Sequence, residues 1–381
     1  MPQNTHLEIM SAEVERLPEP SREASNLQAL QENAEKLAQA ITWLPNTPSS
    51  RALSERCRSL RAALRPLLQA LEAPLPESPI ADDFRWLYDN VRLLYTELQS
   101  TEEILQPLKR IPHVRGQNGE VGPRIAALAQ GFLDATSYQF SEPEFTLFVG
   151  TVQQTTVLEF RELWGLVSAL KLVLLEQVVL RGRALVRDPG NESYAVGVCI
   201  RSLRDVSQTP WKGVIEPLVR FDHVLCQDPA GSYAQMDFDS RELYRKKVAN
   251  IAAHSDCSEM EVAQEALALA EQARRKVYAD PRMALRESHI GYYLVDKGVT
   301  LLHSRVGFKH PFGQRVQALL RKHPDEFFLL GIEFLTFALV SLVLVLITDP
   351  FTSPALILFS MLSLLLPCSQ SAVQLMNYLT T

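Results

Sequence analysis

The chain has 381 residues, a net charge of −6 and 46% hydrophobic residues. The negative charge disfavours general nucleic-acid binding, and five scattered cysteines without a C-x-x-C pair disfavour a disulfide framework or a zinc site. Glycine and aromatic residues are few, whereas apolar residues recur at helical spacing. The sequence therefore predicts an all-α protein, with room before Phe327 for one large or two modest domains.

The N-terminal part of the chain is predicted to be a tail followed by helices. Residues 1–20 are acidic and polar and predict a disordered acidic tail. An N-terminal helical segment is expected over 21–110. Its first helix is predicted to begin at Ser25, which opens a capping-box pattern, with further helices near 51–72 and from Asp82.

A stretch rich in proline and glycine, residues 106–123, follows these helices. It has no apolar periodicity, and its G-x-x-G spacing lacks the Gly-Lys-Ser/Thr of a phosphate loop. We therefore predict a plain loop that joins two parts of the body. The second part is expected to be a helical cytoplasmic domain over 124–325.

Residues 162–180, "ELWGLVSALKLVLLEQVVL", form an apolar stretch long enough to cross a membrane. Lys171 and Glu176 lie near its middle, and each charge there costs a few kcal/mol in lipid. A long core helix of the body is the better interpretation, with the two charges facing an edge or each other.

Asp237 and Asp239 form a D-x-D pattern, which resembles the motif that holds a metal-bound nucleotide sugar in many glycosyltransferases. Such a site needs both carboxylates at the end of a strand and aimed at one metal. Asp239 instead stands before a predicted helix with Glu242 three residues on, which favours an N-cap. Ser258 repeats this helix-start pattern.

On the helix that Asp239 opens, Tyr244 is predicted to face inward, and Arg241 and Arg245 lie together on another side. The two arginines belong either to a solvated face or to a docking surface for an acidic partner. The possible interaction face comprises Arg241, Tyr244, Arg245, His289, Tyr292 and Asp296.

A second polar group comprises His289, Tyr292, Tyr293 and Asp296, whose spacing places them on one side of a helix. Such a cluster is able to transfer protons or stack on a sugar, but it more often forms a buried hydrogen-bond network. No nucleophile or second carboxylate lies near it in the sequence, and we predict the network.

Residues 327–347 are almost continuously apolar, and about 21 residues at 1.5 Å each cover the roughly 30 Å hydrocarbon core of a bilayer. They predict a first transmembrane helix. A second membrane segment is expected over 354–379, which either continues past Pro367 as a kinked span or ends in an interfacial helix.

The predicted orientation follows from the basic residues that precede the first span without any acid between 305 and 324, namely Arg305, Lys309, Arg315, Arg321 and Lys322. The connection 348–353 has no positive charge. The positive-inside rule therefore predicts that the N-terminal body is cytoplasmic and that the turn around Asp349 lies on the far side of the membrane.

Glu333 is an intramembrane polar residue if the first span begins at Phe327, since it then lies about 10 Å deep. Either the span begins later and Glu333 lies near the headgroups, or the carboxyl group contacts other helices.

Several segments, in this order, resemble the N-terminal region of the bacterial cyclic β-1,2-glucan synthases: "TSYQFSEPEF", "ELWGLVSALKLVLLEQ", "DPAGSYAQMDFDSRELYRKKVANIA", "SEMEVAQEALALA", "HIGYYLVDKG" and "LLLPCSQSAVQLMNYLTT". The resemblance covers most of 124–381. It implies a very large inner-membrane protein in which this region precedes a UDP-glucose-dependent glycosyltransferase domain and then a glycoside-phosphorylase-like module.

We therefore expect this chain to be a non-catalytic anchoring and positioning section of such a synthase, as a fragment or split product. No catalytic, cofactor-binding or metal-binding residue is predicted in it, while UDP-glucose and a divalent metal are implied for the complete enzyme. The expected partners are the lipid bilayer and a glycosyltransferase module, in the same chain or a separate one, and no nucleic acid. The alternative is a free-standing membrane-anchored helical adaptor that binds another protein.

Overall fold

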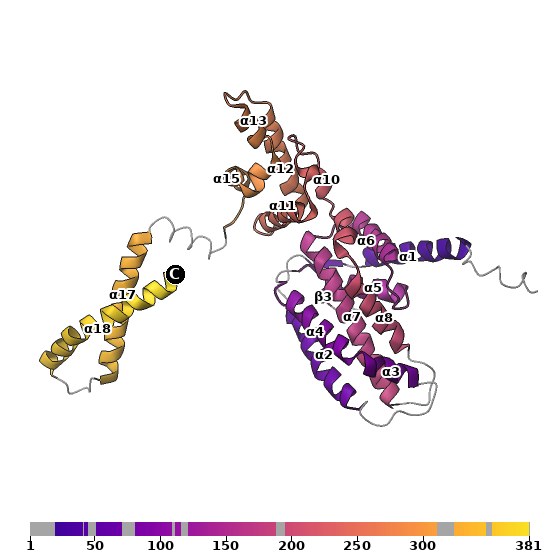
Figure 1. The fold of residues 1–381 in the computed structure, drawn as a ribbon, viewed down its shortest axis with the longest axis horizontal. Helices are drawn as coiled ribbons and strands as arrows, with labels where there is room; N and C mark the ends of the chain where they lie inside the picture. Colours follow the sequence, from indigo (N-terminus) through magenta and orange to yellow (C-terminus); the bar gives the residue numbers. More distant parts are fainter. Residues whose placement is uncertain are drawn as a thin grey trace, which may run out of the picture. The chain divides into compact units, whose positions relative to one another are not determined.

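The computed structural model describes residues 20–40, 42–44, 51–70, 81–108, 111–115, 121–187, 195–310, 324–347 and 353–380. The chain divides into two compact units, Met1–Gly307 and Phe308–Thr381, and both are built almost entirely of helices (Figure 1). The predicted all-α class is confirmed. The predicted acidic tail lies outside the described residues up to position 19.

The described residues in the first part of the first unit form eight α-helices and three short strands. The helices are α1 (Pro20–Ala40), α2 (Arg51–Ala70), α3 (Ala81–Asp89), α4 (Val91–Leu105), α5 (Arg124–Ala135), α6 (Glu142–Thr155), α7 (Phe160–Arg187) and α8 (Val196–Gln208). The strands are β1 (Thr42–Leu44), β2 (His113–Arg115) and β3 (Val121–Pro123).

Helix α7 is the centre of this part, because α2, α4, α5 and α8 all pack against it. Of its most apolar stretch, 72% is buried inside the protein. The Lys171 ammonium lies 2.8 Å from a Glu97 carboxylate oxygen on α4, and Glu176 pairs with Arg56 of α2 at 2.5 Å. The predicted core helix is confirmed, and its two charges are paired with neighbouring helices rather than with each other.

Two of the predicted N-terminal helices differ from the structure, one in its start and one in its continuity. Helix α1 begins at Pro20, five residues before Ser25, and proline suits the first position of a helix because that residue's N–H has no intrahelical partner. The helix expected from Asp82 is two helices separated at Asn90. The Asn90 amide donates to the Trp86 carbonyl at 2.8 Å and accepts a hydrogen bond from Arg204.

The stretch predicted to be a plain loop contains two of the three strands. Strand β2 pairs antiparallel with both β1 and β3, and Val114 lies opposite Trp43 and Gly122. Strands of three residues are too short to show an alternating pattern, so sequence periodicity does not detect them. Helices from both sides of this stretch pack together on α7, and the stretch therefore separates no compact units.

The rest of the first unit consists of shorter helices around α11 and α12. They are α9 (Trp211–Ile215), η1 (Glu216–Leu218), α10 (Asp222–Leu225), η2 (Tyr233–Gln235), α11 (Phe238–Ala252), α12 (Glu259–Arg274), α13 (Pro281–Glu287), α14 (Ile290–Val295) and α15 (Val299–Arg305). The predicted cap at Ser258 is confirmed, because its hydroxyl and the Glu261 carboxylate form a reciprocal capping box.

The second unit is a helical hairpin of α17 (Pro324–Ile347) and α18 (Pro354–Thr380). Helix α18 continues through Pro367 as one element, so the second segment does not stop at that proline. The two helices approach closely at Gly331, where a Cβ atom would lie 2.6 Å from the Met376 methyl group.

The outer surface of this hairpin is apolar. Only 6% of the most apolar stretch of α17 and 11% of that of α18 is buried inside the protein. Both helices are long and hydrophobic enough to cross a membrane. An exposed apolar surface of this extent, on helices of this length, is typical of membrane spans. The predicted transmembrane hairpin is confirmed.

Candidate functional site

Arg245 is the centre of a buried ionic cluster on α11. Its side chain is 1% exposed, and its Nε donates to Asp222 at 2.7 Å while its Nη2 donates to Glu216 at 2.8 Å. Arg241, one turn earlier, reaches the same Glu216 oxygen at 2.7 Å. The prediction that Arg241 and Arg245 form a solvated or docking face is wrong for Arg245, because two acidic groups from other elements enclose its guanidinium.

The cluster extends to a buried phenol. Tyr233 is fully buried, and its hydroxyl donates to Asp222 at 2.5 Å. Burial raises the pKa of Tyr233, and the adjacent Asp222 carboxylate adds to the shift. Burial opposes the charge of Arg245, but its hydrogen bonds to Asp222 and Glu216 outweigh that and raise its pKa. The geometry is that of a buried ion pair in which Arg245 and Tyr233 both bind Asp222.

His289 and Tyr244, which are 45 residues apart, meet in a second cluster. The His289 ring lies 2.7 Å from Asp228 through Nδ1 and 3.3 Å from the Tyr244 hydroxyl through Nε2. A Cβ atom at Gly291 would lie 2.4 Å from that hydroxyl, so glycine is required for this approach.

Asp228 holds this second cluster in place. Its side chain is completely buried and accepts hydrogen bonds from the backbone N–H groups of Ser232, Tyr233 and Ile290. Burial opposes its ionised form, yet the hydrogen bonds from His289 and the backbone lower its pKa. With both carboxylate oxygens engaged, Asp228 fastens the start of α14 to the segment between α10 and η2, and the arrangement is structural.

Tyr292 and Asp296 turn away from His289 toward α13. Asp296 accepts two hydrogen bonds from Arg286, at 2.6 and 2.8 Å, and the Arg286 guanidinium lies 5.8 Å from the centre of the Tyr292 ring. Helix α14 ends at Val295, so the helical spacing that would place Asp296 beside His289 does not persist. The single predicted polar face is in fact two separate networks.

The two aspartates of the D-x-D pattern also diverge. Asp237, not Asp239, is the N-cap of α11, and its carboxylate accepts from the Ser240 N–H at 2.6 Å. Asp239 lies in the first turn and pairs with Lys212 at 2.6 Å. Because one carboxylate caps a helix and the other faces a lysine, the pair does not fit the metal site that the motif would need.

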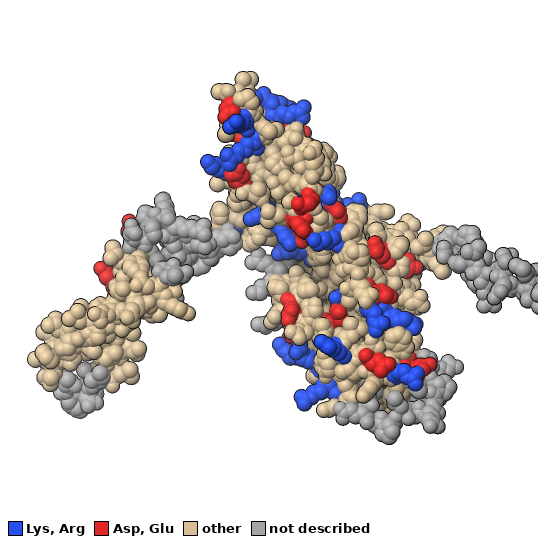
Figure 2. Space-filling view, viewed as in Figure 1, with Lys and Arg blue, Asp and Glu red and all other residues tan. Residues whose placement is uncertain are grey.

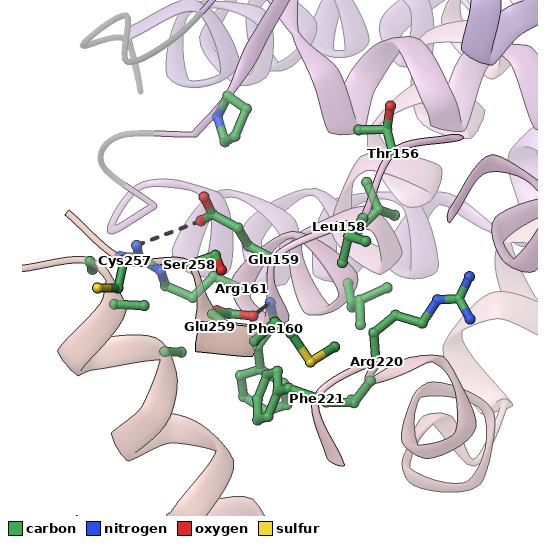
Figure 3. A pocket seen from close by; sticks show the side chains of 18 of the residues that line it. Thr156, Leu158, Glu159, Phe160, Arg161, Arg220, Phe221, Cys257, Ser258 and Glu259 are labelled. Atoms are coloured by element: carbon green, nitrogen blue, oxygen red, sulfur yellow. Dashed lines mark hydrogen bonds and ion pairs between the residues drawn. The ribbon is translucent and has the colours of Figure 1, made fainter. Parts of the chain in front are cut away.

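A cleft of about 870 Å³ opens beside the start of α7 (Figure 3). None of the residues around it was predicted as a site residue, and Ser258 was singled out only as a helix start. The Glu259 carboxylate, from the first turn of α12, accepts the Phe160 N–H at 2.8 Å and so caps α7 from another helix. Next to it, Glu162 accepts the Glu159 N–H at 3.0 Å and forms a buried ion pair with Arg124.

Burial raises the pKa of Glu259 to about 8, although its bond from Phe160 opposes this shift. Burial also raises the pKa of Glu159, and the charge of Glu162 adds to it. Acidic residues in the first turn of a helix are the sequence signal for such sites. That signal does not reveal that Glu259 meets Glu162 and Glu159, which are 97 and 100 residues away in sequence, at the start of α7. The carboxyl groups are engaged in caps and ion pairs, and they join α7 to α12.

Glu333 is exposed on the surface of α17, within the apolar stretch that runs from Phe328 to Leu346. Its neighbours Phe334 and Phe337 are each 73% exposed. The carboxyl group therefore faces the medium that surrounds the hairpin.

Comparison with known proteins adds one relative, and no family model matches the chain. Over 183 residues, which are 48% of this chain, it is 32% identical to the cyclic beta-(1,2)-glucan synthase NdvB of Rhizobium meliloti (strain 1021). The chain is similar to a cyclic β-1,2-glucan synthase. The resemblance predicted from the sequence is confirmed. The matched residues span only 6% of the length of NdvB, so nearly all of that protein has no counterpart in this comparison.

Proposed function

We propose that this chain is the anchoring and positioning section of a bacterial cyclic β-1,2-glucan synthase. Glucosyl transfer from UDP-glucose is carried out by other domains, and this section holds them at the membrane. The observation that carries the proposal is the hairpin of α17 and α18, whose apolar exterior requires a bilayer and which follows a large helical body. The similarity to NdvB supplies the enzyme class.

The chemistry of the body supports a non-catalytic role. The polar clusters around Arg245 and His289 are closed, since their charged groups bind one another or cap helices. The D-x-D aspartates point to Ser240 and Lys212. Acid–base or metal catalysis needs groups that converge on a shared substrate, and these groups diverge.

The inner membrane and a cytoplasmic body are part of the proposal. The basic run that begins at Arg305 precedes the first span, and residues 348–353 contain an aspartate but no lysine or arginine. This asymmetry favours retention of the body on the cytoplasmic side.

The test has two arms. The full chain, purified in lipid nanodiscs, is incubated with UDP-glucose and Mg²⁺ or Mn²⁺, and the released UDP and glucan are measured. We expect neither above background. In the native gene, deletion of 324–380 should move the body to the soluble fraction and abolish glucan synthesis by membranes.

Two results contradict the proposal. Turnover by the purified chain that disappears in Asp237→Ala would make the chain an enzyme with a metal site. Undiminished glucan synthesis after deletion of the hairpin would remove the anchoring role.

A further inference from the structure

The end of the first unit that leads into the hairpin exposes an unusual number of large apolar side chains. Thirteen large hydrophobic side chains are exposed in the described part of this unit, and five of them fall within 25 residues. Val277 is 100% exposed and Leu285 is 64% exposed. The five residues, on the segments and short helices from the end of α12 to α15, are Val277, Met283, Leu285, Val295 and Leu301.

The same stretch is basic in a chain that is acidic as a whole. Residues 274–307 contain seven basic and three acidic residues, for a net charge of +4, whereas the whole chain carries −6. Figure 2 shows blue side chains gathered around α13. Lys276, Arg282 and Lys297 are exposed and form no ion pair within the described residues, so their charges are available to a partner.

Covalent geometry keeps this stretch near a bilayer. Gly307 and Phe328, where the apolar window of α17 begins, are separated by 21 residues of chain. A chain of that length reaches at most about 70 Å even when fully extended. The local concentration of lipid around residues 274–307 is therefore high, and a weak attraction is sufficient to keep the surface bound.

We propose that the surface formed by residues 274–307 docks on the headgroups of anionic lipids. The lysines and arginines bind lipid phosphates, and exposed apolar side chains such as Leu285 enter the boundary between headgroups and acyl chains. Two weak signals, cationic and apolar, together give stable membrane binding where either alone is marginal. A second copy of the chain is a poor occupant, because two surfaces of charge +4 repel each other.

This docking does not depend on glucan synthesis, and it fixes the orientation of the body at the membrane. The experiment uses the full chain in nanodiscs of zwitterionic phosphatidylcholine or of phosphatidylcholine with phosphatidylglycerol. A nitroxide is attached through Leu285→Cys in a background that carries Cys226→Ser and Cys257→Ser. Collisions with oxygen, which dissolves in lipid, are compared with collisions with a water-soluble nickel chelate.

We expect oxygen to dominate at position 285 in anionic nanodiscs and the nickel chelate to dominate at a control label introduced by Leu180→Cys. Leu180 is 62% exposed, close to the value for Leu285, and lies on α7. A triple variant should lower the ratio of docked to undocked molecules about a hundredfold, since each cation near an anionic surface contributes about fivefold. Its substitutions are Lys276→Gln, Arg282→Gln and Lys297→Gln. Arg58→Gln, Arg65→Gln and Arg92→Gln remove the same charge from α2 and α4 and should change nothing.

Three outcomes contradict the proposal. The label at 285 stays accessible to the nickel chelate in both lipids, or the neutralised variant docks as well as the wild type. In the third outcome the label loses access to the chelate without gaining access to oxygen, which identifies a protein rather than lipid as the occupant. Loss of glucosyl transfer has no bearing on any of these measurements, so failure here is distinct from failure of the proposed function.

Discussion

Individual charged residues in this protein are used mainly to hold its helices together. Arg245 was expected at the surface from its spacing with Arg241, yet Asp222 and Glu216 enclose it. Sequence spacing identifies neighbours on one helix, but it does not identify acidic groups supplied by other elements. The same limit applies to Glu259, whose partner Phe160 begins a helix 99 residues earlier.

The burial of Arg245 predicts a large effect of its removal. Arg245→Met should lower the free energy of unfolding of the body by about 3–5 kcal/mol, because the buried Asp222 loses its counter-charge while Glu216 keeps only Arg241. The adjacent Lys246 pairs with Glu242 at the surface, and Lys246→Met should cost less than about 0.5 kcal/mol. Urea unfolding of the full chain in detergent, followed by circular dichroism, measures both. Equal effects of the two substitutions would show that the buried cluster contributes no stability.

The raised pKa of Glu259 predicts a pH-dependent stability. The native carboxyl group binds its proton up to about pH 8, whereas the unfolded one releases it near its ordinary value of 4.5. The native state therefore binds more protons between these values, and stability falls as pH rises from about 4.5 to 8. Glu259→Gln keeps an acceptor for Phe160 without the charge, and it should flatten this part of the profile and raise the melting temperature at pH 8. Parallel wild-type and Glu259→Gln profiles from pH 5 to 8 would contradict the assignment.

Two long helices, α7 and α17, are each apolar enough to cross a membrane, yet they have opposite surroundings. Helix α7 is enclosed by α2, α4, α5 and α8, and its Lys171 and Glu176 pair with neighbouring helices. Within the described residues of the second unit, helix α17 packs against α18 and exposes its apolar surface. Two central charges were the sequence feature that distinguished them, because such charges are tolerated beside counter-charges and are expensive in lipid.

Glu333 lies within the apolar stretch of α17, and its substitution is predicted to affect glucan synthesis. A carboxyl group within hydrocarbon costs a few kcal/mol unless a polar group of another helix binds it. We expect Glu333→Gln and Glu333→Leu to insert normally in the native gene and to reduce glucan synthesis, the Leu variant by about tenfold and more than Gln, because an interhelical hydrogen bond contributes about 1–2 kcal/mol. Phe334→Leu, at a neighbouring exposed position, is the control. Wild-type synthesis by the Leu variant would mean that Glu333 lies at the headgroups and contacts no other helix.

The whole molecule combines a large polar-surfaced body with an apolar hairpin, and the proposed anchoring role depends on which side of the membrane the body occupies. Basic residues precede α17, and residues 348–353 contain no lysine or arginine. This difference defines the expected orientation of α17 in the membrane.

Topology reporters test this direction. A reporter fused after His303 should be active only in the cytoplasm, and one inserted within 348–353 should be active only in the periplasm. Removing the positive charges of Arg315, Arg321 and Lys322 should increase the fraction of inverted molecules, since these charges lie closest to the span. Both reporters on one side of the membrane would show that α17 does not cross it.

The sequence by itself determined the helical class, the core position of α7, the membrane hairpin and the similarity to cyclic β-1,2-glucan synthases. Each of these depends on composition, period or segment order, which are properties of consecutive residues. Only the tertiary structure decided that Arg245 is buried, that His289 meets Tyr244 and Asp228 while Asp296 turns to Arg286, and that Glu259 caps α7. These contacts join residues from different elements, which local spacing does not reveal. For the buried groups Arg245 and Asp228, burial selects the partner of the charge, because an unpaired charge in the interior is too costly to retain.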